Sequence, residues 1–403
     1  MTNWIGIDVS KSTHKYRLVD DGGEPVGKAV SFANSRDGFN AFVQKLRTLE
    51  EVKIALEATG PYWLALYDFL TNAGFKVTVL NPLQVNAFRG TGLRKTKCDS
   101  KDAYWIAEFL RIGYGKPMSV PEPTVQTLRE LSRYRFALVD EICDHKRRVL
   151  GMLVRVFPEY EELFSDIFLV SSMKLLETAA TPEDILALDT NELVELLSKA
   201  SRGRFGQEKA HLIREAAAQT IGVGWLADAA RIEIVSMLQI IGFLELQVKR
   251  LEAELARLME EQCEFLTTVT GVGPVLGAAI VGEVLDINRF ETGKAFVAFA
   301  GIDPAVHQSG QFDGQQMHMS KRGSPHLRRA LWLVACNAYR DDPDMQAFYA
   351  RKKAEGKHHN TIIGAIARKM AGRIYAVWKG NQPYRSAGPT EAGTLDANEA
   401  HAQ

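Results

Sequence analysis

Two short stretches, WIGIDVS at residues 4–10 and KIALEAT at residues 53–59, carry the pattern that decides the fold of the first part of the chain. Apolar residues recur at every second position in both stretches, which is typical of strands with one covered face. The first strand is expected to end at Asp8 and the second at Glu57. Two acidic side chains therefore stand at equivalent positions of two predicted strands.

These strand-end acids share a second feature, a small residue two positions earlier on the same face of the strand. Gly6 precedes Asp8 and Ala55 precedes Glu57, so we expect room for a ligand beside each carboxylate. An acid at the end of an apolar strand is costly to bury unless a cation meets it. The pair predicts a shared metal ion, and two independent acids that face solvent are the alternative.

The surrounding sequence alternates strand and helix patterns and predicts an α/β domain over residues 1–118. Helices are expected from about Ser35 and from Tyr62. The other strands are expected at KYRLVDD (15–21), VGKAVSF (26–32) and FKVTVLN (75–81). The first three strands lie close enough in sequence to form an antiparallel meander, with a hairpin turn at residues 20–23.

Composition limits the class of protein. The chain has 403 residues, of which 46% are hydrophobic and 24% charged, so it can build two or three packed domains and is not wholly disordered. Its four cysteines lie far apart without CxxC spacing, which argues against a zinc site and a disulfide framework. No apolar run reaches the roughly 20 residues of a membrane span. We expect a cytoplasmic protein with no signal peptide and no membrane partner.

The formal net charge is zero, but the charges are segregated along the chain. Residues 159–199 hold ten acidic residues against two basic ones, and this stretch is predicted to be a solvated helical insertion with caps at Thr181 and Asp189. Residues 300–379 hold thirteen basic residues against six acidic ones. The positive surface that a nucleic acid would need is thus expected in the carboxyl-terminal part.

Two long helical seams are expected in the middle of the chain, residues 119–265. Seven positions with 3,4 spacing run from Leu128 to Val149, and five of them are apolar. Seven of eight such positions are apolar from Ile241 to Phe265. Each seam needs a partner helix. The candidates are the other seam in the same chain or the same helix of a second subunit, and we expect a coiled coil that assembles a dimer or tetramer.

A second pair of acids lies in RKTKCDSKDAYWIAEFL, residues 94–110. Asp99 and Asp102 are three residues apart at the start of an amphipathic helix and therefore share one face. Helix starts favour acids in any protein, which is the structural alternative. Five basic residues surround them: Arg89, Arg94, Lys95, Lys97 and Lys101. Acids that bind Mg²⁺ beside bases that hold phosphates indicate a site that processes phosphodiesters.

These segments resemble the amino-terminal RuvC-like DEDD domain of the bacterial insertion-sequence transposases known as the "IS one-ten" family, relatives of the Piv DNA invertases. The resemblance rests on GIDVSK, EATGPYW, NPLQV and RKTKCDSKDAYWIA, with Cys98 where the motif usually has threonine. It implies a ribonuclease H-like fold and a bound Mg²⁺ (or Mn²⁺). The metal-binding acids would be Asp8, Glu57, Asp99 and Asp102.

The carboxyl-terminal region, residues 266–380, is predicted to be mostly helical. Its first segment, TVTGVGPVLGAAIVGEV from Thr268, has the pattern of a helix-hairpin-helix element in which Gly271 and Gly273 let a phosphate approach backbone N–H groups. A tight interhelical turn without a ligand is the alternative. A polar loop with Ser309 follows. The basic residues expected to bind nucleic acid here are Lys321, Arg322, Arg328, Arg329, Lys352 and Lys353.

The segment around Ser309 resembles the carboxyl-terminal transposase domain of the same family, in which the serine before glycine is the nucleophile and SKRG follows it. The family resemblance implies that DNA strands are cut and rejoined through a phosphoserine, directed by a structured noncoding guide RNA that pairs with the element ends and the target. His307 and His326 are candidate bases near Ser309. Such a protein would work on the bacterial nucleoid.

Three other functions fit parts of the sequence. A plain Holliday-junction resolvase would share the acids and leave Ser309 dispensable. An actin-like ATPase would share GIDVSK, but no second alternating α/β half follows residue 120. A noncatalytic RNA-binding scaffold would not need the acids. The remaining residues, 381–403, are poor in apolar anchors and predicted to be disordered.

Overall fold

The structure is a computed structural model of the chain. It describes residues 2–89, 99–114, 117–118, 120, 122–260, 262–263, 265–304, 308–309, 312–313 and 319–385, with the side chains of residues 99–101, 308–309 and 312–313 excepted. Arg94, Lys95, Lys97, His307 and the end of the tail lie outside the described residues. The chain divides into two compact units, residues 1–121 and 122–403, and each is described by itself.

The first unit is built on a five-stranded sheet with the order β3-β2-β1-β4-β5. Its strands are β1 (Thr2–Asp8), β2 (Thr13–Val19), β3 (Pro25–Ala33), β4 (Glu51–Glu57) and β5 (Val77–Leu80). The first three form the predicted antiparallel meander, and β4 and β5 add in parallel to β1. At the β2–β3 turn Gly23 has a φ of 89°, which glycine adopts without a steric penalty. This strand order and these directions are those of a ribonuclease H-like sheet.

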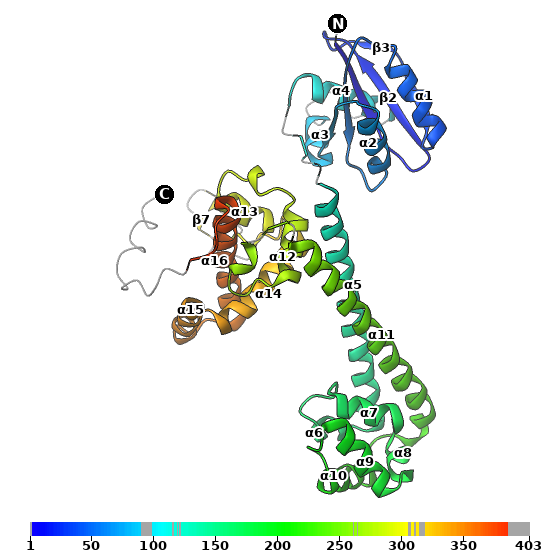
Figure 1. Cartoon of the computed structure of the whole chain (residues 1–403), viewed down its shortest axis with the longest axis vertical. Coiled ribbons are helices and arrows are strands. Elements are labelled where there is room, and N and C mark those ends of the chain that lie inside the picture. Colours follow the sequence, from blue (N-terminus) through cyan, green and yellow to red (C-terminus); the bar gives the residue numbers. More distant parts are fainter. Residues whose placement is uncertain are drawn as a thin grey trace. The chain divides into compact units, whose positions relative to one another are not determined.

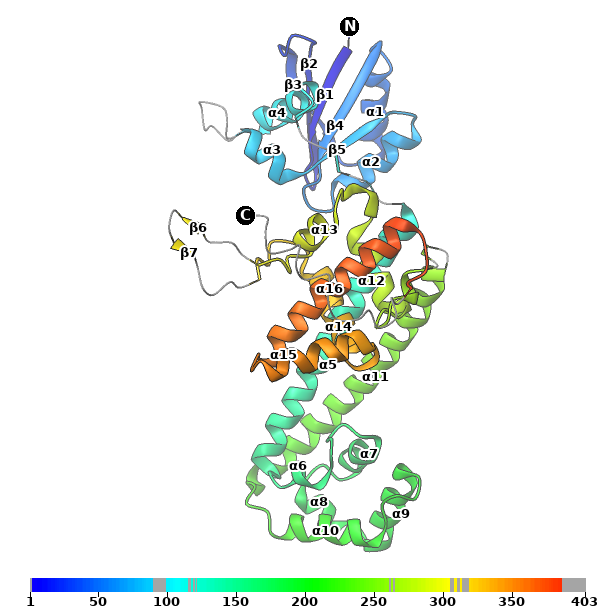
Figure 2. The same ribbon diagram turned by 90° about the vertical axis from the view of Figure 1, so that its left-hand side faces the viewer.

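Helices cover both faces of this sheet (Figure 2). They are α1 (Arg36–Leu46), α2 (Trp63–Asn72), α3 (Pro82–Arg89) and α4 (Asp99–Arg111). Ile5 and Ile7 pack with α1 and α2 on one face, and Ala55 packs with α3 and α4 on the other. Because side chains alternate along a strand, Asp8 and Glu57 stand on the face that α3 and α4 cover.

Helix α4 fills the space beside the strand-end acids. A methyl group at Gly6 would overlap the carbonyl oxygen of Ala103 and the amide nitrogen of Ala107. Ala55 likewise packs in a small core with residues of α3 and α4. The expectation that these small residues leave room for a ligand is therefore wrong. They allow α4 to lie close against β1 and β4, which brings its first turn toward the acids.

The second unit begins with two long helices, α5 (Pro123–Val156) and α11 (Ala227–Glu260), which lie side by side (Figures 1 and 2). Ile241, Leu244 and Val248 of the second predicted seam are buried in a core with residues of α5. Arg135 of α5 pairs with Glu252 of α11 across the same contact. The seam is therefore closed within the chain, which is the first of the two alternatives, and it carries no argument for assembly.

Five short helices join the far ends of this pair. They are α6 (Tyr160–Leu163), α7 (Val170–Thr178), α8 (Pro182–Ala187), α9 (Thr190–Ser201) and α10 (Gln207–Ala218), followed by the 3₁₀ turn η1 (Gly224–Leu226). The acidic stretch is more than a solvated insertion, because Tyr160, Leu175 and Leu197 are fully buried. Its apolar residues form one core with the ends of α5 and α11.

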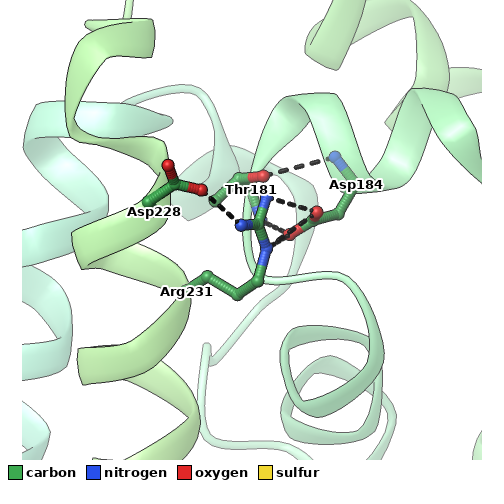
Figure 3. A network of polar contacts seen from close by, with 4 residues as sticks. All are labelled: Thr181, Asp184, Asp228 and Arg231. Carbon is green, nitrogen blue, oxygen red and sulfur yellow. Dashed lines mark hydrogen bonds and ion pairs between the residues drawn. The ribbon is translucent and has the colours of Figure 1, made fainter.

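The two predicted caps of this insertion are confirmed. The Thr181 side chain accepts from the Asp184 amide, and Asp184 accepts from the Thr181 amide in return, which is a complete capping box. The Asp189 carboxylate accepts from the Asn191 amide. Figure 3 shows that Arg231 of α11 donates to Asp184 and also to Asp228. The capped end of α8 is thereby fixed to α11.

The remaining helices pack at the other end of the α5–α11 pair (Figure 1). They are α12 (Pro274–Val284), α13 (Gly293–Ala300), α14 (Pro325–Asp341), α15 (Pro343–Ala354) and α16 (His359–Gly380), with 3₁₀ turns η2 (Leu266–Thr268) and η3 (Ile287–Arg289). A hairpin of two short strands, β6 (Gln308–Ser309) and β7 (Phe312–Asp313), lies between α13 and α14 in the sequence. Leu128 and Leu258 join the core of these helices, so the predicted helical middle and carboxyl-terminal region share one body.

Candidate functional site: the acidic face of the first sheet

The sheet register brings Asp8 and Glu57 to adjacent positions. Ile7 of β1 pairs with Leu56 of β4 in parallel, and each acid is the next residue along its strand. Carboxyl ends of parallel strands meet at one edge of a sheet, so the two acids occupy neighbouring strand ends. Glu57 is 7% exposed, and its carboxylate accepts a hydrogen bond of 3.0 Å from the Thr59 hydroxyl.

A third acid joins them through Arg89, the last residue of α3. The Arg89 guanidinium contacts Glu57 Oε2 through Nη2 at 2.9 Å and Asp102 Oδ1 through Nη1 at 3.5 Å. Asp102 lies in the first turn of α4. This helix packs closely on this face of the sheet because Gly6 has no side chain. Asp8, Glu57 and Asp102 are thus positioned by three different elements on one face of the sheet.

These acids suit a hard divalent cation, because carboxylate oxygens are the ligands that Mg²⁺ and Mn²⁺ prefer. Arg89 contacts both Glu57 and Asp102, so the two carboxylates already share one positive group. Within the described part of the chain, no three metal-binding side chains yet converge on one point. The Asp99 side chain, the fourth predicted ligand, lies outside the described residues.

The basic run near these acids divides in two. Arg89 faces the carboxylates rather than solvent. Arg94, Lys95 and Lys97 lie outside the described residues, and Lys101 is described only as a backbone position of α4. Their predicted contact with nucleic acid stays a prediction.

The second unit holds the other predicted site. Ser309 ends β6 and pairs in register with Phe312 of β7, although its side chain lies outside the described residues. The SKRG turn that follows leads into α14. Lys321 in that turn has a φ of 52°, and a methyl group at Gly323 would overlap the carbonyl oxygen of Phe299. The turn is therefore held tightly against the end of α13.

A buried ionic cluster fixes the start of α14. Glu283 of α12 is 3% exposed and accepts from Arg133 of α5 through both oxygens, at 2.6 and 3.1 Å. It also accepts from the Ser324 hydroxyl at 2.7 Å, and Ser324 caps α14. Burial alone would raise the pKa of Glu283, but these hydrogen bonds and the charges of Arg133 and Arg129 outweigh it and lower the pKa.

The predicted nucleic-acid contacts of this unit have different surroundings. Lys321, Arg322 and Lys353 are exposed. Arg329 forms two hydrogen bonds of 2.7 Å with Asp140 of α5, and Lys352 pairs with Glu355 in its own helix. Arg328 donates to the carbonyl oxygen of Ala300. Nucleic-acid binding by these six residues stays a prediction, with Arg329 the one most committed to contacts inside the chain.

The helix-hairpin-helix glycines have distinct environments as well. Gly271 has a φ of 88°, and a methyl group there would crowd Val334 and Ala338 of α14. Packing within the chain therefore already requires this glycine. Gly273 is the N-cap of α12 and has nothing near its Cβ position. Phosphate binding at this turn stays a prediction. Of the two glycines, Gly273 is the one with free space beside it.

Comparison with known proteins covers both units. Residues 5–158 match the DEDD domain model of IS110 transposases, described as "Transposase", and residues 263–350 match the model described as "Transposase IS116/IS110/IS902 family". The chain is 24% identical to an uncharacterised 44.8 kDa protein of insertion element IS116 from Streptomyces clavuligerus, over 96% of this chain and 97% of the relative. It is 23% identical to the pilin gene-inverting protein of Moraxella bovis, over 94% and 97%.

The chain belongs to the IS110 family of transposases. The family resemblance deduced from the motifs is thereby confirmed, and the chain is a DNA transposase/recombinase. Among solved structures, the transposase is similar to Thermus thermophilus RuvC in complex with a Holliday junction substrate. That match has 16% identity and a TM-score of 0.22, and it covers 29% of this chain and 98% of that one. A score so low carries no conclusion. No described helix of the transposase is long and apolar enough to cross a membrane.

Sequence patterns do not reveal the contacts of two charged residues of the transposase, Arg89 and Glu283. Arg89 was grouped with phosphate-binding bases, although a single arginine between two acidic segments could have been read as their counter-ion. Glu283 was not singled out at all. Its signal is a lone charge inside the apolar helix PVLGAAIVGEV, where an unpaired carboxylate would be costly. Its partner Arg133 is 150 residues away, so no local spacing reveals the pair.

Proposed function

We propose that the transposase cuts and rejoins the DNA strands of an insertion element with a Mg²⁺- or Mn²⁺-binding acidic site and Ser309 as nucleophile. The observation that supports this most is the placement of Asp8 and Glu57 at neighbouring strand ends, with Asp102 linked to Glu57 through Arg89 on the same face of the first sheet. The match of residues 263–350 to the second transposase model, which spans Ser309, supports the role of the serine.

The chemistry divides between the two units. Asp8, Glu57, Asp99 and Asp102 would hold the metal, which when bound offsets the charge of a phosphodiester and lowers the pKa of a nearby hydroxyl. The Ser309 oxygen forms a bond to phosphorus while one phosphorus–deoxyribose bond breaks. The serine proton leaves to a base, and the departing sugar oxygen takes up a proton.

Rejoining reverses this exchange. A sugar hydroxyl of a second strand loses its proton and bonds to the phosphorus, and Ser309 leaves and regains its proton. The number of phosphoester bonds is the same before and after, so no nucleotide triphosphate is consumed. This balance distinguishes the proposal from an ATPase, and the described residues of the second unit form helices and a short hairpin rather than a second α/β half.

The test is strand exchange on a plasmid that carries both element ends. Asp8→Ala, Glu57→Ala, Asp102→Ala and Ser309→Ala should each abolish recombination while the circular dichroism spectrum stays that of the wild type. In denaturing gels the wild type should form a covalent protein–DNA adduct that Ser309→Ala lacks. Cleavage by Ser309→Ala at the wild-type rate would contradict the nucleophile assignment and favour a Holliday-junction resolvase.

We also propose that DNA ends and target are paired by a noncoding guide RNA bound to this chain. The exposed side chains of Lys321, Arg322 and Lys353, with Gly273 at the N-terminus of α12, support a nucleic-acid surface on the second unit. Affinity should fall steeply as salt rises, because phosphate contacts release counterions. Sequencing the RNA that copurifies with the chain tests the guide directly, and the absence of any enriched species would contradict it.

The working unit is proposed to be a homo-oligomer, a dimer or tetramer, because recombination of two duplexes needs several cleavages in one complex. The internal seam gives no support for this. Instead the exposed apolar side chains of Trp225 in η1 and of Ile232 and Phe243 in α11, at 82%, 69% and 61%, are the candidates for contact with a second chain. Light scattering on nuclease-treated protein tests whether the free chain associates, and a monodisperse monomer would contradict association without nucleic acid.

A further inference from the structure

Arg89 holds an unusual position for a residue near a metal-binding site. Its guanidinium lies against two carboxylates, with Nη2 at 2.9 Å from Glu57 and Nη1 at 3.5 Å from Asp102. Nη1 also donates to the Asn86 side chain at 3.3 Å, one turn earlier in α3. The three charged side chains are largely withdrawn from water, with 19% of the Arg89, 9% of the Glu57 and 15% of the Asp102 side chain exposed.

The charges of this group are not balanced. One guanidinium carries one positive charge and cannot lose its proton at any ordinary pH. Two carboxylates that share it therefore retain one negative charge between them. A divalent cation would neutralise both, and the guanidinium would then face a doubly positive ion at the same oxygens. Arg89 and the metal would therefore repel one another where both contact Glu57 and Asp102.

The Arg89 guanidinium can also rotate away from the acids at a limited cost in hydrogen bonds. Arg89 Nε is buried and has no hydrogen-bond partner. Rotation of the guanidinium away from the acids therefore breaks only contacts of its two terminal nitrogens, and no hydrogen bond of Nε is lost. An unsatisfied buried donor costs free energy, so this arrangement is less stable than a fully satisfied ion pair.

We propose that Arg89 is an internal counter-ion that competes with the divalent metal for Glu57 and Asp102 and leaves them when the metal binds. This rests on the proposed function, in which those acids are metal ligands. The metal-free acids are kept together by Arg89, so the ligands stay positioned without a cation. The same contact lowers the affinity for the metal. The ion pair between Arg89 and the two acids must break before the metal binds, and the free energy that this costs is subtracted from the free energy of metal binding.

The test measures metal binding rather than recombination. Mn²⁺ is titrated into the full-length chain, and the free ion is followed by its electron paramagnetic resonance signal. Arg89→Ala should bind Mn²⁺ roughly tenfold more tightly than the wild type, within the usual range of coupling between two binding events. A residue that merely shapes the site would give the opposite sign, weaker binding on its removal. Equal or weaker binding by Arg89→Ala overturns the proposal.

Arg111→Ala is the matched control. Arg111 lies in the same unit, and its side chain is 22% exposed and paired with Glu108 at 2.6 Å. Its removal should leave Mn²⁺ affinity unchanged, and a gain equal to that of Arg89→Ala would mean that any lost positive charge suffices, which overturns the specific role. If Arg89→Ala does not fold, Arg89→Gln takes its place with the same two outcomes.

A third variant separates this inference from the proposed function. Glu57→Gln combined with Asp102→Asn should lose the Mn²⁺ site. If that variant binds Mn²⁺ like the wild type, these acids are not the ligands and the proposed function fails along with the inference. If it loses the site while Arg89→Ala shows no tighter binding, only the competition by Arg89 is refuted.

Discussion

Two ionic clusters of the transposase have opposite balances of charge. In the first unit one guanidinium, that of Arg89, serves the two carboxylates of Glu57 and Asp102. In the second unit one carboxylate, that of Glu283, receives Arg133 and the Ser324 hydroxyl, with Arg129 also close at 3.9 Å. The first cluster has a surplus of ligand oxygens, and the second has a surplus of donors around one buried acid.

The difference distinguishes a cluster that suits cation binding, as proposed, from a cluster that joins helices. Surplus carboxylates with a single movable counter-ion can accept a further cation, so their arrangement suits exchange. Both oxygens of the Glu283 carboxylate accept hydrogen bonds from α5 and from the N-terminus of α14, so neither is available to bind a cation. The carboxylate instead fixes those helices to α12. The same residue types therefore suit the proposed metal binding in one unit and join helices in the other, and the ratio of acids to bases distinguishes the two clusters.

The largest stability effect is expected from Glu283→Ala. Removal of this buried carboxylate leaves Arg133 and Arg129, whose side chains are 36% and 29% exposed, without their acid. The loss of one partner of a buried pair typically costs about 3–5 kcal/mol, and the partial exposure of the arginines places the expected cost at the lower end of that range. Unfolding in urea should show the transition of the second unit at a lower midpoint, while that of the first unit stays in place. A change of less than about 1 kcal/mol would mean that water reaches these arginines, and the contrast between the clusters would be lost.

A smaller loss is expected from Gly6→Ala. The added methyl group overlaps backbone atoms of Ala103 and Ala107, so α4 must move away from β1. Overpacking of this kind costs roughly 1–3 kcal/mol. Since α4 carries Asp102, Mn²⁺ binding should weaken together with stability. This outcome would show that the close approach of the α4 backbone to β1, rather than the ion pair, positions Asp102.

Gly151→Ala is the control for that substitution. Gly151 lies inside α5, and nothing surrounds its Cβ position. Alanine in a helix interior is favoured over glycine by roughly 0.5–1 kcal/mol, so this variant should be slightly more stable than the wild type. If both glycine variants lose stability alike, the close approach of α4 is not the cause.

Much of the fold of the first unit could be predicted from the sequence, because strands are recognised from alternation over a few neighbouring residues. Alternation located all five strands, and the acids Asp8 and Glu57 stand at the strand ends as predicted. The helix α3 was not expected, since its eight residues are too few for a clear period. The face of the sheet on which Gly6 lies was predicted. The element that packs on that face is α4, which comes almost a hundred residues later in the chain and could not be predicted from the strand pattern.

Long-range pairing was beyond the reach of sequence patterns in the second unit. The apolar spacing predicted two long helices, and of the two possible partners for each seam we expected the helix of another subunit. Spacing defines a stripe but not the partner that covers it, and burial of Ile241 and Val248 against α5 decides the question. The caps at Thr181 and Asp189 were predictable because capping acts over three residues.

Little loss of stability is expected from Asp102→Asn, the next test of the comparison. Arg89 keeps its 2.9 Å contact with Glu57, and the more distant contact at 3.5 Å is the one removed. We expect a change within about 1 kcal/mol, as for weak ion pairs. Recombination and Mn²⁺ binding should nevertheless be lost. A destabilisation as large as that of Glu283→Ala would instead place both clusters in the same structural role.

The smallest effect is the response of the Glu283 cluster to acid, and it rests on the lowered pKa of Glu283. A carboxyl group whose pKa is lower in the folded than in the unfolded chain binds fewer protons when folded, so its contribution to stability is present above the ordinary glutamate pKa. That contribution is lost as the pH falls through the lower, folded value. Glu283→Gln cannot titrate, so the difference in urea midpoint between it and the wild type isolates this group. The difference should stay constant from pH 8 to about pH 5 and shrink below the ordinary pKa of 4.5. A difference that grows as the pH falls would mean that Glu283 is protonated more readily in the folded chain, and the enclosing donors would then not stabilise its charge.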